Sequence, residues 1–142
     1  MPLSDAVRLT VYNPTGGQPV GEVNDLSLVL QVSDGKHAAL FTGDVTMKGE
    51  PEALPDCDIL HVPHHGADNA TSEALLAMTT PEYAVISVGE NNFGHPGDGA
   101  LQRIAESGAK VLRTDVSGAI KLTLSQDRWR VWTFLEGPDE LE

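Results

Sequence analysis

The sequence predicts an α/β domain, and two observations lead to this prediction. Apolar runs of strand length recur along the chain, and two segments with a helical stripe separate the three central runs. The predicted order is a β-hairpin, then strand–helix–strand–helix–strand, then a second hairpin, which is typical of an α/β sheet. With 142 residues, of which 40% are hydrophobic, the chain has the size of one domain. We expect a single domain over 1–142, with a core over about 7–135 and an acidic tail over 136–142.

The N-terminal elements follow from aliphatic runs and turn residues. A tight turn is expected at Asp34-Gly35, because glycine adopts a positive φ at little cost. The strand after this turn runs directly into Gly43-Asp44. The predicted strands cover residues 7–12, 26–32 and 37–42, and a polar loop covers 16–24.

The following segment alternates strands with two helices. Thr71 or Ser72 is expected to cap the first helix, which runs to Met78. Asp98 is expected to cap the second helix, and Gly108 to end it in the left-handed conformation. The apolar stripes are predicted at Ala74, Leu75 and Met78 in the first helix and at Leu101, Ile104 and Ala105 in the second. The predicted strands cover residues 58–62, 83–88, 111–114, 119–124 and 129–134.

Polar side chains follow the ends of the central strands. They are Asp44, His64, His65, His95 and Asp115. Ligand-binding residues of α/β sheets typically lie on loops after strands, so we expect these side chains to meet at one edge. Neutral imidazole is a common metal ligand and a proton shuttle, and the pattern favours a metal or phosphate site over an ordinary surface loop.

Each of these side chains has a functional and a structural interpretation. Asp44 is either a carboxylate that bridges two cations or a turn-forming aspartate. On an extended backbone His64 and His65 would point in opposite directions, so that one reaches a metal while the other faces substrate or a neighbouring group. His95, between Gly94 and Pro96, either donates to a phosphoryl oxygen or leaving group or stabilises its own loop by a hydrogen bond.

Five further residues are expected to be structural. His37 and His61 are assigned non-catalytic roles, and Asn24-Asp25 is more consistent with a turn than with a weak oxygen ligand. Cys57 lies between Asp56 and Asp58, whose charges should raise the pKa of its thiol. A single cysteine also excludes an internal disulfide and a cysteine-based zinc cluster.

The composition restricts the kinds of partner. Twenty-one acidic residues against nine basic ones give a net charge of −12, which is a poor surface for binding phosphate backbones. The acidic surface is either an adaptation for solubility or a sign that metal, rather than basic side chains, holds an anionic substrate. No apolar run approaches the roughly 18 residues of a membrane span, and the N-terminus lacks the features of a signal peptide. These features predict a soluble chain and do not specify its compartment.

The sequence resembles the metallo-β-lactamase-like domain of the ComEC/Rec2 family of DNA-uptake competence proteins. Blocks in the same order carry this resemblance over about residues 7–125, among them Asn24-Asp25-Leu26-Ser27-Leu28-Val29-Leu30, Leu40-Phe41-Thr42-Gly43-Asp44, Asp58-Ile59-Leu60-His61-Val62-Pro63-His64-His65-Gly66, Ala84-Val85-Ile86-Ser87-Val88-Gly89, Gly94-His95-Pro96, Leu112-Arg113-Thr114-Asp115 and Gly118-Ala119-Ile120. The resemblance implies a four-layer αββα sandwich with a mixed β-sheet, flanking helices and a site for two divalent ions, Zn or Mn.

The resemblance also assigns roles to individual residues. Asp44 would bridge both metals, His65 would bind one of them, and His64 and His95 would contact the substrate phosphate. Two ions about 4 Å apart would hold a phosphodiester and activate a bound water. In competence proteins this domain accompanies a membrane channel and is thought to degrade one DNA strand, whereas relatives hydrolyse phosphorylcholine esters.

Several positions depart from the family pattern. The first-half motif His-x-Asp/His-x-Asp-His is absent, Ala67 replaces the usual serine, and Gly97 replaces a second histidine. Asn24 stands where other branches of the fold have a histidine ligand. We therefore expect the chain to correspond to the C-terminal half of the domain, to bind divalent metal weakly or not at all, and to lack hydrolase activity in isolation. Its apolar sheet face should be covered by the missing N-terminal half or by a second copy in a homodimer.

Three functional hypotheses follow from the sequence. The first is a fragment of a metal-dependent phosphodiesterase or nuclease of the competence type that acts on DNA or another phosphoester. The second is a non-catalytic interaction module that keeps the loops of the site. The third is an intact small metalloenzyme, for example a phosphorylcholine-esterase-like hydrolase, and the small number of candidate ligands makes it the weakest of the three.

Overall fold

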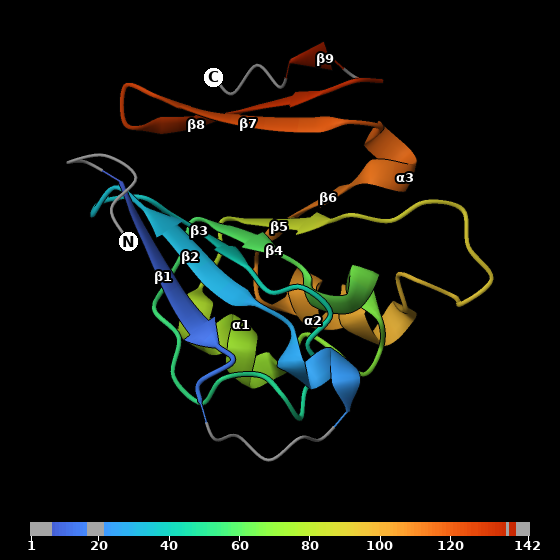
Figure 1. Cartoon of the computed structure of the whole chain (residues 1–142). Helices are drawn as coiled ribbons and strands as arrows, with labels where there is room; N and C mark the ends of the chain where they lie inside the picture. The colour runs from blue at the N-terminus through green and yellow to red at the C-terminus, as the bar shows by residue number, and fades with distance from the viewer. Residues whose placement is uncertain (1–6, 17–21, 136, 139–142) are drawn as a thin grey trace.

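The computed structural model describes residues 7–16, 22–135 and 137–138 (Figure 1). It is an α/β structure whose main sheet has six strands in the order β1-β2-β3-β4-β5-β6. These strands are β1 (Arg8–Asn13), β2 (Val29–Ser33), β3 (Ala38–Phe41), β4 (Ile59–His61), β5 (Tyr83–Ile86) and β6 (Lys110–Arg113). Spatial order in this sheet follows chain order.

The main sheet is mixed. The pairs β1–β2 and β2–β3 are antiparallel, whereas β3–β4, β4–β5 and β5–β6 are parallel. The loops that follow β3, β4, β5 and β6 therefore leave from one edge of the sheet. The helical elements are η1 (Val23–Leu26), η2 (Pro63–Gly66), α1 (Glu73–Thr79), α2 (Asp98–Glu106) and α3 (Thr114–Ser117).

One face of the main sheet packs against α1 and α2 (Figure 1). Leu40, Leu60 and Ala84 occupy one register row across β3, β4 and β5, and all three are fully buried. Leu75 of α1 and Ile104 of α2 complete this cluster from the helical side. The apolar area removed from water here provides the main support for the edge that carries the polar loops.

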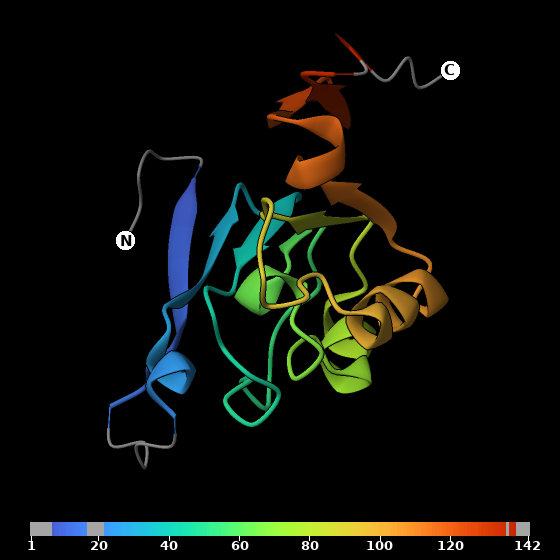
Figure 2. The same cartoon turned by 90° about the vertical axis from the view of Figure 1, so that its right-hand side faces the viewer.

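A second, three-stranded sheet covers the β4–β6 side of the opposite face. Its strands are β7 (Ile120–Ser125), β8 (Arg128–Thr133) and β9 (Gly137–Pro138). Val131 of β8 packs with Ile59, Tyr83 and Leu112, which come from β4, β5 and β6. Figure 2 shows this sheet lying toward β6 and away from β1. A mixed α/β sheet is thus established, and the complete four-layer sandwich stays a prediction.

The N-terminal strands leave part of this second face exposed. Val11 of β1 is opposite Leu30 of β2, which is in turn opposite Phe41 of β3. Val11 is 55% exposed and Phe41 is 43% exposed. The apolar surface expected from the sequence therefore lies on β1–β3.

Several predicted boundaries are confirmed. Ser72 caps α1, because its hydroxyl accepts a hydrogen bond from the Leu75 amide. Gly35 and Gly108 adopt positive φ at the predicted turn and helix end, with values of 92° and 85°. The predicted C-terminal hairpin forms as β7 and β8, and Gln126 and Asp127 make the turn between them.

Other predicted details are wrong. The second strand begins at Val29, because residues 23–26 form η1 and residues 27–28 connect it to the strand. Gly97 is the N-cap of α2, and Asp98 is its first residue. The buried stripes lie at Leu75, Leu76 and Thr79 in α1 and at Ala100 and Ile104 in α2, whereas Ala74 and Ala105 are exposed.

The structure describes the two ends of the chain only in part. In the predicted acidic tail, residues 137–138 pair with β8 as β9, and residues 136 and 139–142 lie outside the described part. Residues 1–6, which the sequence predicts to lack the features of a signal peptide, also lie outside the described part of the chain. Among the helices that the structure does describe, none combines the length and the apolar character of a membrane span.

Candidate metal and phosphate site

Three loops meet at the edge where β3, β4 and β5 end. The hydroxyl of Thr42 donates to the carbonyl of His61 at 2.5 Å, and the amide of His64 donates to the carbonyl of Gly43 at 3.0 Å. The amide of Gly97 donates to the carbonyl of Gly66 at 2.9 Å. These three hydrogen bonds therefore hold the Gly43-Asp44 segment, η2 and the loop after β5 in one arrangement.

The backbone of η2 differs from the extended conformation assumed in the sequence prediction. His64 has φ 51° and His65 has φ 55°, both in the left-handed region. Gly66 follows with φ 77°, and a Cβ at this position would lie 2.8 Å from the Cβ of Pro96. Such conformations cost about 1–3 kcal/mol each in non-glycine residues and persist only where surrounding contacts enforce them. The two histidines still point in different directions, but a left-handed turn sets those directions.

Asp44 and His65 lie next to each other. Oδ1 of Asp44 is 3.7 Å from Nε2 of His65, and the two side chains are 48% and 51% exposed. The amide of Asp44 donates to the hydroxyl of Ser27 at 3.1 Å, which fixes the start of the aspartate loop. Gly43 has φ 55°, and an added Cβ would lie 2.9 Å from Ser27 Cβ. Asp44 and His65 are thus neighbours in space, and their shared role as metal ligands stays a prediction.

The hydrogen bond of Nδ1 in the His65 ring determines whether Nε2 can accept a proton or bind a cation. Nδ1 of His65 is 2.7 Å from the carbonyl oxygen of Ser87. Because a carbonyl oxygen only accepts, Nδ1 donates the proton, and in the neutral ring Nε2 carries a lone pair. Metal-binding histidines commonly have this arrangement, in which a backbone carbonyl orients the ring. In the neutral ring a lone pair of His65 and a carboxylate oxygen of Asp44 face one another, as two donors to one cation would, whereas in the protonated ring the same contact is an ion pair.

His64 and His95 form a separate pair beside these donors. Their ring centroids are 5.6 Å apart, with the planes tilted by 60°. Nε2 of His64 is 3.4 Å from the side-chain nitrogen of Asn24, and its Nδ1 is buried without a hydrogen-bond partner among the described residues. Asn24 therefore lies beside His64 at the edge of the site, where its amide nitrogen contacts the ring. The sequence prediction that Asn24-Asp25 forms a turn did not indicate this contact.

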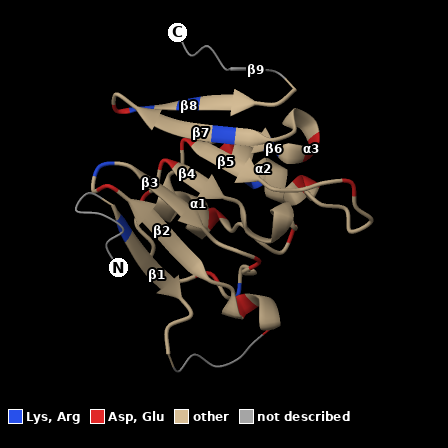
Figure 3. Ribbon diagram, turned by 45° about the horizontal axis from the view of Figure 1, so that its top comes forward, with Lys and Arg blue, Asp and Glu red and all other residues tan. Residues whose placement is uncertain are grey.

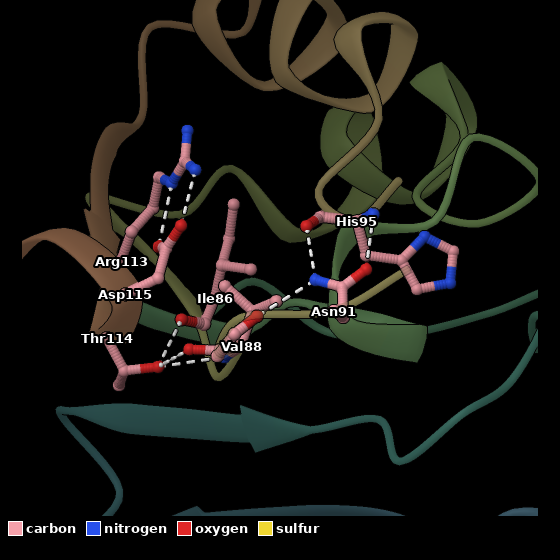
Figure 4. A network of polar contacts seen from close by, with 8 residues as sticks. Ile86, Val88, Asn91, His95, Arg113, Thr114 and Asp115 are labelled. Carbon is pink, nitrogen blue, oxygen red and sulfur yellow. Dashed lines mark hydrogen bonds and ion pairs between the residues drawn. The ribbon is translucent and has the colours of Figure 1, made fainter. Parts of the chain in front are cut away.

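The loop that carries His95 is held by Asn91 (Figure 4). Oδ1 of Asn91 accepts a hydrogen bond from the amide of His95 at 3.1 Å. The same oxygen accepts a hydrogen bond from the amide of Phe93 at 3.0 Å. Nδ2 of Asn91 donates to the carbonyls of Gly89 and His95 at 2.9 and 2.8 Å. The role of Asn91 was not predicted from sequence, although an asparagine inside a glycine-bounded loop is a known signal for a turn held by its side chain.

The beginning of the same loop is held by Thr114. Its hydroxyl donates to the carbonyl of Val88 at 2.6 Å and accepts from the amide of Val88 at 2.8 Å (Figure 4). This contact fixes the backbone next to Ser87, whose carbonyl orients His65. Thr114 is thus a positioning residue for the edge that carries the metal-donor pair.

Asp115 does not join the other polar side chains. It is exposed and forms a two-point ion pair with Arg113, with contacts of 3.0 and 2.7 Å. Hydrogen bonding from Arg113 lowers the pKa of the Asp115 carboxyl. The neighbouring charges thus form a local pair at the start of α3, and Figure 4 shows this pair apart from Asn91 and His95.

The two remaining histidines differ in position. His37 lies 3.5 Å from an oxygen of Asp34 and contacts the ring of Trp129 edge-on. His61 ends β4, stacks on Phe41, and has its pKa lowered first by burial and then by the neighbouring His65. His61 is therefore close enough to His65 and Asp44 to feel their charges, which its assignment to a non-catalytic role did not predict.

Cys57 and Asp25 have structural surroundings. Burial raises the pKa of the Cys57 thiol to about 12, and the charges of Asp58 and Asp56 add to this effect. The thiol is therefore protonated at neutral pH, as the sequence predicted. Oδ1 of Asp25 accepts bonds from the amide and hydroxyl of Thr46 at 3.1 and 2.7 Å. Burial works to raise the pKa of Asp25, and these hydrogen bonds lower it overall.

The donor set fits part of a metal site. Two donors to one ion at about 2.1 Å each lie roughly 3 to 4 Å from one another, which suits the Asp44–His65 separation. A catalytic zinc site has three protein ligands and an open position. Within residues 7–16, 22–135 and 137–138, no three His, Cys, Asp or Glu side chains converge closely enough to hold a metal. Asp44 and His65 are thus two adjacent candidate ligands, one fewer than a catalytic zinc site uses.

Comparison with known proteins identifies relatives of most of the chain. It is 35% identical over 134 residues to ComE operon protein 3 of Bacillus subtilis, a match that covers 90% of this chain and 17% of that protein. It is 37% identical over 142 residues to competence protein ComA of Neisseria gonorrhoeae, covering 92% of this chain and 20% of the relative. Recombination protein 2 of Haemophilus influenzae is 37% identical over 112 residues, or 76% of this chain and 14% of that protein.

No family model and no solved structure matches the chain. The chain spans a fifth or less of the length of the three relatives named above, with shares of 17%, 20% and 14%. The matches nevertheless run over most of the chain at 35% to 37% identity. The chain belongs to the ComEC/Rec2 family of competence proteins.

Proposed function

We propose that this chain supplies part of a metal-dependent site that hydrolyses DNA phosphodiesters in a competence protein. The observation that carries the proposal is the geometry of His65. Its Nδ1 is held by the Ser87 carbonyl, and its Nε2 faces Asp44 at 3.7 Å. A hydrogen bond that orients one ring nitrogen and leaves the other free to bind is typical of metal ligands.

The proposed division of roles follows the two pairs of side chains. Asp44 and His65 bind cation, and His64 and His95 hold the substrate phosphate beside it. A pair of Zn or Mn ions would supply Lewis acidity and lower the pKa of a bound water. The rings of His64 and His95 are 5.6 Å apart, so both lie within reach of one phosphate group. A histidine in this position can donate a proton to a phosphoryl or leaving-group oxygen.

The charge distribution supports binding of the phosphate through metal. The net charge is −12, and Figure 3 shows lysine and arginine scattered over the ribbon. Of the arginines near the polar edge, Arg103 donates to the carbonyls of Thr71, Asp68 and Ala70, and Arg113 is paired with Asp115. These guanidinium groups are already engaged within the fold. An anionic substrate would therefore depend on bound cations for its charge neutralisation.

The rest of the metal shell is proposed to come from the longer protein. Two protein ligands are fewer than a catalytic site uses, so the chain alone should bind metal weakly and lack hydrolase activity. The same part of the longer protein is proposed to cover the exposed apolar face of β1–β3, where Val11 and Phe41 are partly exposed. In its absence we expect the isolated chain to associate through this face. Val11→Lys should then reduce association in sedimentation, Val23→Lys on η1 should not, and a wild-type monomer at high concentration would contradict the proposal.

The test of the activity uses the intact protein that contains this chain. End-labelled single-stranded DNA is incubated with Mn²⁺, and cleavage is followed on gels for wild type, Asp44→Asn and Asp127→Asn. Loss of a metal ligand should lower the rate by at least about 100-fold, since even outer-shell changes cost 10–100-fold. Asp127 is an exposed carboxylate paired with Lys36, so its variant should cleave normally. Equal cleavage by wild type and Asp44→Asn would contradict the proposal.

A non-catalytic role is the second candidate, and the small donor set favours it. A site that has lost its activity would also retain two neighbouring donors without a third ligand. The described residues show this pattern, because no third acidic, histidine or cysteine side chain joins Asp44 and His65. Under this hypothesis the intact protein shows no metal-dependent cleavage that responds to Asp44→Asn. The same experiment therefore separates the two functions.

A further inference from the structure

Phe93 is the most exposed of the large hydrophobic side chains that the structure describes. It is 83% exposed and lies in the loop between β5 and α2. The packing of the fold does not explain the residue, because neither hydrophobic cluster of the core includes it. A single exposed hydrophobic residue is common on protein surfaces, so exposure alone does not assign a role to Phe93. What distinguishes Phe93 is that its ring stacks on His95 of the candidate site.

The tip of this loop is held in place. The amide of Phe93 donates to Oδ1 of Asn91 at 3.0 Å, and the same oxygen accepts from the amide of His95. Nδ2 of Asn91 closes the loop by donating to the carbonyl of His95 (Figure 4). The backbone on both sides of Phe93 is thus fixed by one asparagine. A fixed backbone reduces the conformational entropy lost when a ligand is bound.

The ring of Phe93 continues the row formed by the two site histidines. Its centroid is 6.0 Å from that of His95, with an interplanar angle of 22°, so the rings are stacked. His95 is in turn 5.6 Å from His64. The row runs from the proposed phosphate-binding pair outward to an aromatic ring that is open to solvent. In a nucleotide chain, a base projects from the backbone next to each phosphate.

We propose that Phe93 is a stacking platform for a nucleobase next to the phosphate held at this site, which makes single-stranded DNA the preferred substrate form. This inference rests on the proposed function, because it requires the phosphate to lie near His64 and His95. Base–aromatic stacking contributes about 1–3 kcal/mol per base and tolerates any sequence. In a duplex the bases are already stacked on one another, so the platform selects for single strands. Stacking also needs no basic surface, which suits a chain with a net charge of −12.

The test measures kcat/KM of the intact, Mn²⁺-loaded protein on two oligonucleotides of equal length. One is oligothymidylate, and the other has the same backbone with stable abasic residues in place of every base. Phe93→Ala should lower kcat/KM on oligothymidylate by roughly 5- to 150-fold and leave the abasic strand unchanged. Phe93→Trp should retain the wild-type preference, and Phe93→Leu should behave like Phe93→Ala. Trp132→Ala is the matched control, because Trp132 is a partly exposed aromatic of the second sheet.

The variants separate stacking on a base from packing on His95. A leucine preserves apolar cover over His95 but offers no aromatic face. Wild-type activity of Phe93→Leu, or equal loss on both strands in Phe93→Ala, would overturn the proposal. Loss of cleavage in Asp44→Asn, together with an unchanged preference for bases in Phe93→Ala, overturns the stacking platform alone. Full cleavage in Asp44→Asn overturns the proposed function and the platform with it.

Discussion

Oδ1 of Asp44 lies 3.7 Å from Nε2 of His65, although 21 positions separate the two residues in sequence. They meet because β3 and β4 are adjacent parallel strands, and each residue follows the end of its strand. A hydrogen bond from the amide of His64 to the carbonyl of Gly43 holds the two loops in register. The relationship therefore comes from the topology of the sheet together with the left-handed turn of η2.

Gly66→Ala should destabilise the fold by about 1–3 kcal/mol or more, because φ at this position is 77° and the new Cβ would meet Pro96 at 2.8 Å. The free energy of unfolding in urea measures the change. Gly89→Ala is the matched control in the loop after β5, since a Cβ there meets nothing within 4 Å. Equal destabilisation by the two substitutions would contradict the close packing of η2 against Pro96.

Asn91→Ala should loosen the loop after β5 and leave the core intact. The substitution removes the acceptor for the amides of Phe93 and His95, and each hydrogen bond contributes about 0.5–1.5 kcal/mol. We expect faster hydrogen exchange at these two amides, with a small change in Tm. Asn92→Ala, at the exposed neighbouring position, should leave their exchange unchanged. Unaltered exchange in Asn91→Ala would show that something else holds the loop.

His61 should titrate below the ordinary histidine pKa of about 6.5, because burial, followed by the neighbouring His65, lowers its pKa. The folded protein then favours the neutral ring. Its contribution to stability is present above about pH 6.5 and is lost as the pH falls through this value, since the unfolded chain binds the proton more readily. Imidazole chemical shifts followed from pH 8 to pH 5 measure the midpoint. A midpoint at or above 6.5 would contradict the burial of His61 beside the site.

Much of the main sheet could be predicted from sequence because the strands are aliphatic runs bounded by turn residues. The six strands, the Ser72 cap and the final hairpin follow from patterns within a few residues. The errors occur where competing local features decide the outcome. Asp98 has the chemistry of an N-cap, yet Gly97 takes that position. The side chain of Asp68 occupies the space where a Cβ of residue 97 would lie.

The candidate site was predictable in composition but not in shape. The positions of Asp44 and His65 after adjacent strands were enough to predict that they share an edge. The left-handed backbone of His64 and His65 was not predictable, because tertiary bonds to Gly43 and Gly97 enforce it against local preference. The contact of Asn24 with His64 was also missed, since it joins residues 40 positions apart.

The central claim is that Asp44 and His65 together bind a divalent cation and lack the ligands for a complete shell. The most direct measurement is a Mn²⁺ titration of the chain, with paramagnetic broadening of each histidine ring followed by NMR. His65 should broaden first, at weak affinity, and Asp44→Asn should abolish this selectivity, whereas Asp127→Asn should not. Broadening that begins at His37, a His65 response that survives Asp44→Asn, or tight stoichiometric binding would contradict the claim.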